Sequence, residues 1–358
     1  MINEKDIKLL QNLIEIPSPS GFERNIAEFI YDYLKTLNVN ESQMEIDKQN
    51  NLIVKFDYGR EKTVLMDAHL DEIGFIISNV DRWGSISLQY IGGGDSTILS
   101  ARNLNVLTKN GVIPAVINRK HSHLVYDEDT ELNYSPEQAD VDIGIRERDK
   151  ILKIVSIGDP VVYQHHFREL TSNYFTGYGF DDKSGCFLLI KTIESLIKSK
   201  IKPSVNLIFV FSAQEETGNS KLLPVVRKIK PNLVIEADVT FATDYGNVDE
   251  IEREVGRCEL GKGVSLYRGV DIDESCWELA SNIAKTRKIP YQIQTCCGRI
   301  GYTSLEVTGE VEGIKALVWG IPLRSMHAPT EVININDLIT GSKLLKYFLQ
   351  SKKLKDII

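Results

Sequence analysis

The chain has 358 residues, of which 42% are hydrophobic and 26% charged, and its 42 basic and 50 acidic residues give a formal net charge of −8. This composition is that of a globular protein with enough apolar material for a large core, and it excludes fibrous and disordered chains. The acidic balance, without a cluster of Lys or Arg, argues against a nucleic-acid partner. The longest apolar runs are too short to cross a membrane, so we expect no membrane partner either.

Cysteine usage and the first residues bear on the compartment. The five cysteines are odd in number and show no C-x-x-C spacing, which indicates neither a disulfide framework nor a thiolate zinc site. Residues 1–6 are charged and lack the apolar stretch of a secretory signal. These features predict a cytoplasmic protein with reduced thiols.

The first 72 residues contain two predicted helices and two predicted strands. Apolar residues at helical spacing predict helices around 6–16 and 26–34, and the first helix ends at the breaker stretch 17–21. Short apolar runs at 51–56 and 63–68 have strand character. Helices and strands together indicate the first part of an α/β domain.

From about residue 73 to residue 166 the pattern is β-type throughout. Short apolar runs such as 85–91 and 111–117 are separated by turn signals such as 81–84 and 92–95. No amphipathic helix of ordinary length interrupts them. This segment is predicted to be a compact β-rich domain.

After residue 167, predicted helices and strands alternate. The helices are expected at 183–197, 221–230, 274–285 and 336–349, and the strands at 205–212 and 233–239. Such alternation indicates an α/β fold with a mixed, largely parallel sheet flanked by helices. We therefore predict one α/β domain, made of residues 1–72 and 167–358, with the β-rich domain of residues 73–166 inserted into it.

Acidic residues and histidines stand just beyond the predicted strands. The carboxyl ends of strands in an open α/β sheet meet at one edge, so side chains placed there are expected to lie together. The candidates are His69 and Asp71, Glu215 and Glu216, Asp238, the pair Asp181-Asp182 before a helix, and His327 after the strand-like run 317–321.

Each candidate has an ordinary interpretation by itself. The pair Asp181-Asp182 could cap a helix, and Glu215-Glu216 could be a solvated loop. Taken together, His, Asp and Glu without thiolates suit zinc, cobalt or manganese. Asp71 is placed to accept the second imidazole N–H of His69, and one aspartate of the pair would bridge two ions. The combination predicts a two-metal hydrolase.

The same series resembles the glutamyl aminopeptidase/TET family of co-catalytic dinuclear metallo-aminopeptidases. The matching stretches follow one another in order over nearly the whole chain: 66–74 (MDAHLDEIG), 180–185 (FDDKSG), 214–218 (QEETG), 238–240 (DVT) and 327–331 (HAPTE). The resemblance implies a zinc-aminopeptidase-like fold whose inserted domain is a PDZ-like dimerisation domain. It also implies a homo-oligomer, either a dimer or a tetrahedral dodecamer, that acts on peptides with a free N-terminus.

Residue roles follow from this resemblance. It implies two divalent ions per subunit, zinc or cobalt, with manganese as the alternative. The implied roles are Asp181 as the ligand that bridges both ions, His69 and Asp238 on one ion, Glu216 and His327 on the other, Glu215 as the general base, and Asp71 as the partner of His69.

Three other functions fit parts of the pattern. A metal-dependent deacylase on the same scaffold would use the same ligands. A catalytically silent scaffold protein would be expected to have lost a ligand or the base, and none is replaced. Paired carboxylates alone would fit a glycan hydrolase, but the histidines in register with them argue against it. The chain departs from the family pattern at 217–220, 301–305 and 324–326, which affects the specificity pocket rather than any predicted ligand.

Overall fold

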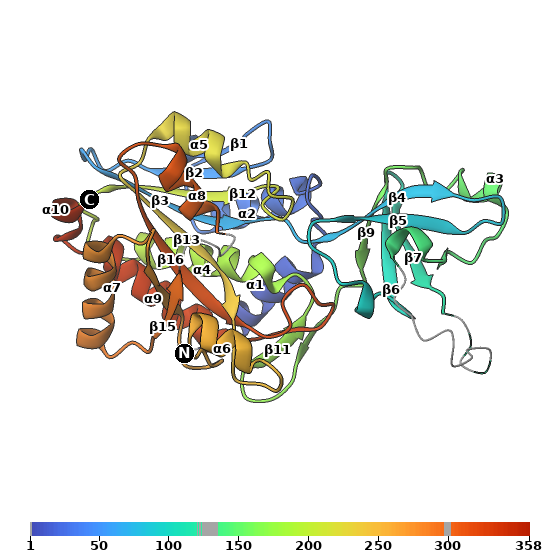
Figure 1. Cartoon of the computed structure of the whole chain (residues 1–358). Helices are drawn as coiled ribbons and strands as arrows, with labels where there is room; N and C mark the ends of the chain where they lie inside the picture. Colours follow the sequence, from blue (N-terminus) through green and yellow to red (C-terminus); the bar gives the residue numbers. More distant parts are fainter. Residues whose placement is uncertain (1, 120, 122, 124–134, 297–301) are drawn as a thin grey trace.

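A large α/β body and a smaller β-barrel that projects from one side of it make up the molecule (Figure 1). The computed structural model describes all residues except 1, 120, 122, 124–134 and 297–301. Both termini lie in the α/β body. No helix among the described residues is both long and apolar enough to span a membrane.

The α/β body is built on an eight-stranded sheet in the order β1-β2-β12-β3-β13-β16-β14-β15. The four middle strands, β12, β3, β13 and β16, are parallel to one another. The antiparallel pairs lie towards the two edges of the sheet. The strands are β1 (Met44–Ile46), β2 (Leu52–Phe56), β3 (Thr63–His69), β12 (Asn206–Ser212), β13 (Leu233–Phe241), β14 (Ser265–Gly269), β15 (Gln292–Cys296) and β16 (Lys315–Leu323). The predicted mixed, largely parallel sheet is confirmed.

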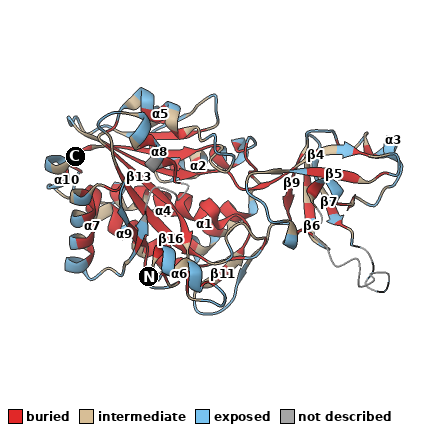
Figure 2. Cartoon of the chain, viewed as in Figure 1, coloured by how far each residue is buried: buried red, intermediate tan, exposed pale blue. Residues whose placement is uncertain are grey.

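Helices cover both faces of this sheet, and the buried residues concentrate on the strands between them (Figure 2). Alternate residues of β3 point to opposite faces, so Met66 packs in the core beneath the larger helix layer and Leu65 in the core on the other side. The larger layer consists of α1 (Glu4–Glu15), α2 (Arg24–Thr36), α4 (Phe180–Ile197), α7 (Glu274–Arg287) and α9 (Ile335–Leu349), and the smaller of α5 (Leu222–Ile229) and α8 (Thr303–Glu310).

Short elements complete the α/β body. A three-stranded antiparallel sheet has the order β10-β11-β17, so that β17, near the C-terminus, pairs with β11, which precedes α4. The remaining elements are β10 (Phe167–Glu169), β11 (Tyr174–Gly177), β17 (Glu331–Asn334), α6 (Asp249–Val255) and α10 (Leu354–Ile357).

The barrel is closed, in the order β4-β5-β8-β7-β6-β9, and has a hydrophobic core of its own. Its strands are β4 (Gly74–Val80), β5 (Ile86–Ile91), β6 (Asn103–Thr108), β7 (Gly111–Ile117), β8 (Val141–Asp142) and β9 (Pro160–Tyr163). Its described residues also form the short helix α3 (Arg148–Ile151) and the 3₁₀ turns η2 (Ser96–Ile98) and η5 (Pro136–Gln138). All of these lie inside the segment for which a β-rich domain is predicted. The exact division at 72/73 and 166/167 stays a prediction.

A buried ion cluster joins the barrel to the α/β body where the chain passes between them. Glu72, just after β3, accepts a hydrogen bond from Lys183 Nζ at 2.7 Å and lies 2.9 Å from His165 Nε2, just after β9. Burial by itself would raise the pKa of Glu72, but the charges of His165 and Lys183 outweigh it and lower the pKa to about 2. The cluster therefore ties both connecting segments to α4, which begins at the candidate site.

Candidate metal centre

Six of the predicted site residues line one cavity of about 170 Å³ at the carboxyl ends of the central strands. His69 ends β3, Asp238 is the sixth of the nine residues of β13, and Asp181 lies in the first turn of α4. The lining residues among the predicted set are His69, Asp181, Glu215, Glu216, Asp238 and His327. The parallel topology therefore brings together residues that are up to 258 positions apart.

Asp181 lies between the two histidines. Its Oδ1 is 3.1 Å from His69 Nε2, and its Oδ2 is 3.3 Å from His327 Nε2. The peptide bond between Asp181 and Asp182 is cis. Each oxygen of one buried carboxylate thus faces a different imidazole, which is the arrangement that a ligand shared by two cations requires.

The remaining carboxylates flank this pair of histidines. Glu216 Oε2 lies 3.2 Å from His327 Nε2, and Asp238 Oδ1 lies 3.7 Å from His69 Nε2. Two groups of three have their potential ligand atoms within 4.8 Å of one another: His69, Asp182 and Asp238, and His69, Asp181 and Glu216. Both groups consist of oxygen and imidazole donors, which suit zinc, cobalt and manganese.

Asp71 organises the site differently from the sequence expectation. His69 Nδ1 lies 3.0 Å from the backbone oxygen of Asp71 and 3.6 Å from its Oδ1, so the nearer acceptor is the backbone. The Asp71 carboxylate accepts the backbone N–H groups of Glu215 at 3.0 Å and Glu216 at 3.1 Å, and the hydroxyl of Ser20. Asp71 therefore positions the loop that carries two other site residues, a role that no local sequence signal announces.

The electrostatics of the site are those of crowded, buried carboxylates. Burial alone would lower the pKa of His327, but its hydrogen bonds with Asp181 and Glu216 raise it to about 11. Burial raises the pKa of Glu215 to about 9, and the nearby charge of Asp238 adds to the effect. Without a cation, protons thus partly neutralise the negative charge, and a bound cation would replace them.

Two further buried acidic residues lie on the strands that carry His69 and Asp238, and the sequence analysis did not predict them as part of the site. Asp67 and Glu236 stand opposite each other on the parallel strands β3 and β13. Asp67 accepts the Ser212 hydroxyl at 3.0 Å, and Glu236 accepts the backbone N–H of Thr303 at 3.1 Å, at the start of α8. Burial, followed by the charge of Glu236, raises the pKa of Asp67 well above its usual value. The sequence signal that could have revealed these two residues is an acidic residue within the apolar run of each strand.

The remaining histidines lie outside the cavity. His165 belongs to the ion cluster with Glu72, His121 and His123 are exposed, and His166 is half-buried. Of the stretch in which the chain departs from the family pattern, Gly301 lies outside the described residues, whereas Tyr302 lines the cavity.

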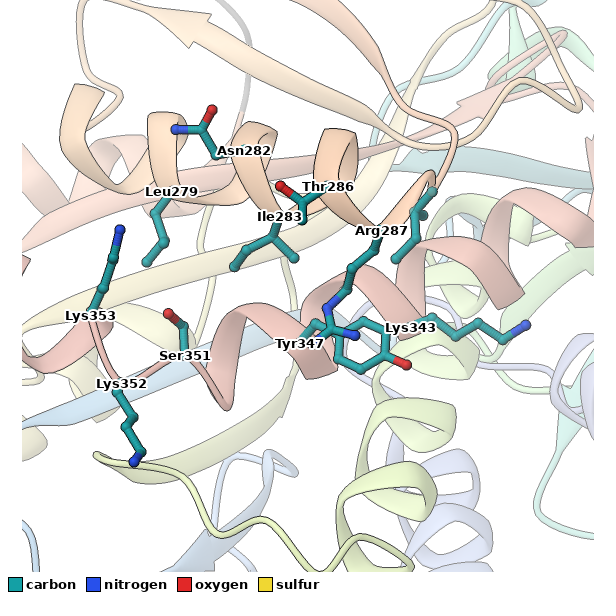
Figure 3. A pocket seen from close by; sticks show the side chains of 11 residues that line it. Leu279, Asn282, Ile283, Thr286, Arg287, Lys343, Tyr347, Ser351, Lys352 and Lys353 are labelled. Atoms are coloured by element: carbon teal, nitrogen blue, oxygen red, sulfur yellow. The ribbon is translucent and has the colours of Figure 1, made fainter.

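A larger cavity, of about 840 Å³, lies between α7 and α9 and has a different character (Figure 3). Arg287 stacks over the ring of Tyr347, 3.7 Å from its centroid, and Lys343, Lys352 and Lys353 also line the cavity. Among the described residues that line it there is no carboxylate, histidine or thiol. Because a cation needs such donors, the smaller cavity at the strand ends is the candidate metal centre.

Known aminopeptidases are similar to nearly the whole chain. A family model described as M42 glutamyl aminopeptidase matches residues 50–344. A lysyl aminopeptidase of Pyrococcus furiosus is 27% identical, over 98% of this chain and 99% of the relative. The structure of an aminopeptidase from Desulfurococcus kamchatkensis is similar with a TM-score of 0.88 at 26% identity, over 99% of this chain and 97% of the other.

One further similar structure concerns assembly. It is the TET1 peptidase of Pyrococcus horikoshii, with a TM-score of 0.82 at 26% identity, over 96% of this chain and 99% of the other. That peptidase can assemble into a tetrahedron or a large octahedral shell.

Proposed function

The chain belongs to the M42 glutamyl aminopeptidase family, whose members are metal-dependent aminopeptidases, and we propose that it removes N-terminal residues from peptides with two divalent cations and Glu215 as the general base. The observation that carries the proposal is the position of Asp181, whose two carboxylate oxygens face His69 and His327 at 3.1 and 3.3 Å. A bridging carboxylate between two ions needs this placement.

The donors around Asp181 divide into two sets in the proposed site. His69 and Asp238 would complete one ion, and Glu216 and His327 would complete the other, each on its own side of Asp181. Asp182, which is also buried and close to His69 and Asp238, is the alternative ligand for the first ion. The donors present therefore fit two cations of the zinc, cobalt or manganese type.

The cations and the protein have separate tasks in this mechanism. A bound divalent cation supplies Lewis acidity, which polarises a carbonyl group and lowers the pKa of water. Glu215 lines the same cavity and has no protein hydrogen bond that would hold its carboxylate away from a substrate among the described contacts. The ionised Glu215, which nearby positive charge favours, takes a proton from the attacking water and later gives it to the nitrogen of the leaving amine.

We also propose that the enzyme is a cytoplasmic homo-oligomer that pairs through its barrel, as a dimer or as part of a dodecamer. Alternate residues of β7, namely Val112, Pro114 and Val116, are exposed on the outside of the barrel and form an apolar stripe. Trp83, another barrel residue, is 70% exposed. Apolar surface of this kind is typical of a contact between subunits. The shells named for the Pyrococcus horikoshii peptidase support assembly in this family.

The test of the proposed reaction is hydrolysis of matched unblocked and N-acylated peptides by metal-stripped protein, with zinc, cobalt or manganese added back. We expect single residues to be released from unblocked peptides only, and only after a cation is added. Cleavage confined to acylated substrates would favour the deacylase alternative, which uses the same ligands. Full activity in the stripped protein would contradict a metal-dependent reaction.

A further inference from the structure

We propose that this enzyme prefers peptides whose N-terminal side chain is uncharged and apolar, such as Leu or Met. The inference rests on the proposed aminopeptidase function and adds its substrate class. Besides the predicted ligands and Glu215, the described residues that line the cavity are Val239, Phe241, Tyr302 and Met326. None of the four carries a charge, and together they form the apolar wall of the site.

Tyr302 contributes its ring rather than a free hydroxyl. Its hydroxyl donates a hydrogen bond to the backbone oxygen of Val239 at 2.8 Å, and the residue is buried. Its ring packs edge-on against Tyr267, with the ring centroids 5.3 Å apart. The Tyr267 hydroxyl is in turn 2.6 Å from the hydroxyl of Thr240. The polar atoms behind the apolar wall are thus engaged with one another, and the ring of Tyr302 is held in place.

Arg324, two residues before Met326 in the chain, is already paired. Arg324 donates to both carboxylate oxygens of Asp244, at 2.8 and 2.6 Å. An acidic N-terminal side chain would therefore find no free cation among the described side chains that line the cavity. A lysine side chain would meet carboxylates that the proposed ions already occupy, with its head group against apolar atoms. Either charge would lose hydration without gaining a free partner among the described residues that line the cavity.

The extent of contact with the apolar wall sets the size of the expected preference. A Leu or Met side chain has four heavy atoms that can pack against the wall, whereas Ala has one. Apolar contacts that distinguish one side chain from a smaller one typically change kcat/KM by about 10- to 200-fold per group.

The first measurement is kcat/KM for unblocked tripeptides Xaa-Ala-Ala with Leu, Met, Ala, Lys or Glu in the first position. We expect Leu and Met to exceed Ala, Lys and Glu by at least about tenfold. A higher value for Lys or Glu than for Leu would overturn the inference while leaving the aminopeptidase in place. Hydrolysis of none of the five peptides, with any cation, would instead contradict the proposed function.

The second measurement assigns the preference to the apolar wall. Met326→Glu is expected to raise the Lys/Leu ratio of kcat/KM at least about tenfold, and Phe241→Arg to raise the Glu/Leu ratio similarly. Val270→Glu is the matched control, because Val270 is 80% exposed and does not line the cavity. Circular dichroism and metal content identify any variant that misfolds or binds metal differently. If both folded variants keep the parental order of substrates, the apolar wall does not determine specificity.

Discussion

The central sheet and the barrel place the ends of their strands differently. In the sheet, β12, β3, β13 and β16 run parallel, so their carboxyl ends and the residues that follow gather at one edge. In the barrel, the neighbouring strands are antiparallel, so successive strand ends alternate between its two rims. Only the sheet therefore concentrates acids and histidines in one cavity. The comparison shows that strand direction, rather than the number of polar residues, determines where several potential metal ligands gather in one site.

The barrel nevertheless reaches the site through one loop. Between β5 and β6, a Cβ atom added to Gly93 would lie 3.0 Å from His327 Nδ1, and one added to Gly92 would lie 3.1 Å from the backbone oxygen of Glu216. The loop thus approaches two predicted ligands of the same ion. The barrel loop approaches the site with its backbone, whereas the α/β body supplies the side chains that are the potential metal ligands.

The largest effect is expected from the residue that joins the two halves of the site. Asp181→Ala removes the carboxylate that faces both histidines, so we expect loss of bound metal and loss of at least about 1,000-fold in kcat/KM. Metal analysis after dialysis measures the first, and peptide hydrolysis the second. Asp149→Ala, an exposed change in the barrel helix α3, is the control. An Asp181→Ala protein that keeps its full metal content would refute the bridging role.

The next effect separates the general base from the ligands. Glu215→Gln keeps the size of the side chain but cannot accept a proton, so we expect unchanged metal content and a kcat lower by about 10²- to 10⁴-fold. Glu216→Gln, one residue away, should weaken metal binding instead. Undiminished hydrolysis by Glu215→Gln would remove this residue from the base role.

The third prediction concerns the junction between the barrel and the sheet. The pKa of Glu72 is about 2 in the folded protein, below its ordinary value of 4.5, because the charges of His165 and Lys183 favour the ionised form. A lowered carboxyl pKa stabilises the fold above the unfolded-state value, and this stabilisation, about 3 kcal/mol, is lost as the pH falls from about 4.5 to 2.

Glu72→Gln should remove this pH-dependent stability and destabilise the protein at neutral pH, because it leaves Lys183 buried without its carboxylate. Denaturant unfolding between pH 3 and pH 7, followed for both proteins, measures the difference. Glu147→Gln, in an exposed ion pair of the barrel, is the control. Equal pH profiles for the Glu72 variant and the parent would show that the junction does not depend on this charge.

The smallest effect is expected at the loop by which the barrel touches the site. Gly93 does not have a positive φ, so Gly93→Ala is compatible with its backbone. Among the described residues other than its chain neighbours, His327 alone has atoms within 4 Å of the added Cβ, so the change perturbs chiefly that ring. We expect an activity loss of about tenfold or less, with weaker binding of one ion and little change in Tm. Gly246→Ala, which meets nothing within 4 Å, is the control. Identical metal affinity in both variants would show that the barrel loop does not position His327.

Much of the fold follows from local pattern. The predicted helices at 183–197 and 336–349 correspond to α4 and α9, and the predicted strands at 63–68 and 233–239 correspond to β3 and β13. These elements have long apolar runs or clear periodicity. The pattern did not predict β14 and β15, the three-stranded sheet or α8. Their sequences are short and mixed. In the three-stranded sheet, β11 also pairs with a strand from a distant part of the chain, β17.

The candidate site was predictable to the same extent. Residue type, together with position after an apolar strand or, for Asp181, before a helix, singled out the six residues that share the cavity, although their catalytic roles stay a proposal. The contacts that complete the site were not accessible in this way. The Asp71 carboxylate binds backbone groups 144 and 145 residues away, and the Tyr302 hydroxyl binds a backbone oxygen 63 residues away.

The sequence by itself determined which residues have the chemistry to bind cations and which strands carry them, because donor type and periodicity are properties of neighbouring residues. Tertiary structure alone decided that Asp181 faces both histidines, that Glu72 joins the barrel to the α/β body, and that an apolar wall lies beside the ligands. These features depend on strand order and on the packing of segments far apart in the chain. Such pairings are selected by the free energy of the whole fold, so no local pattern encodes them.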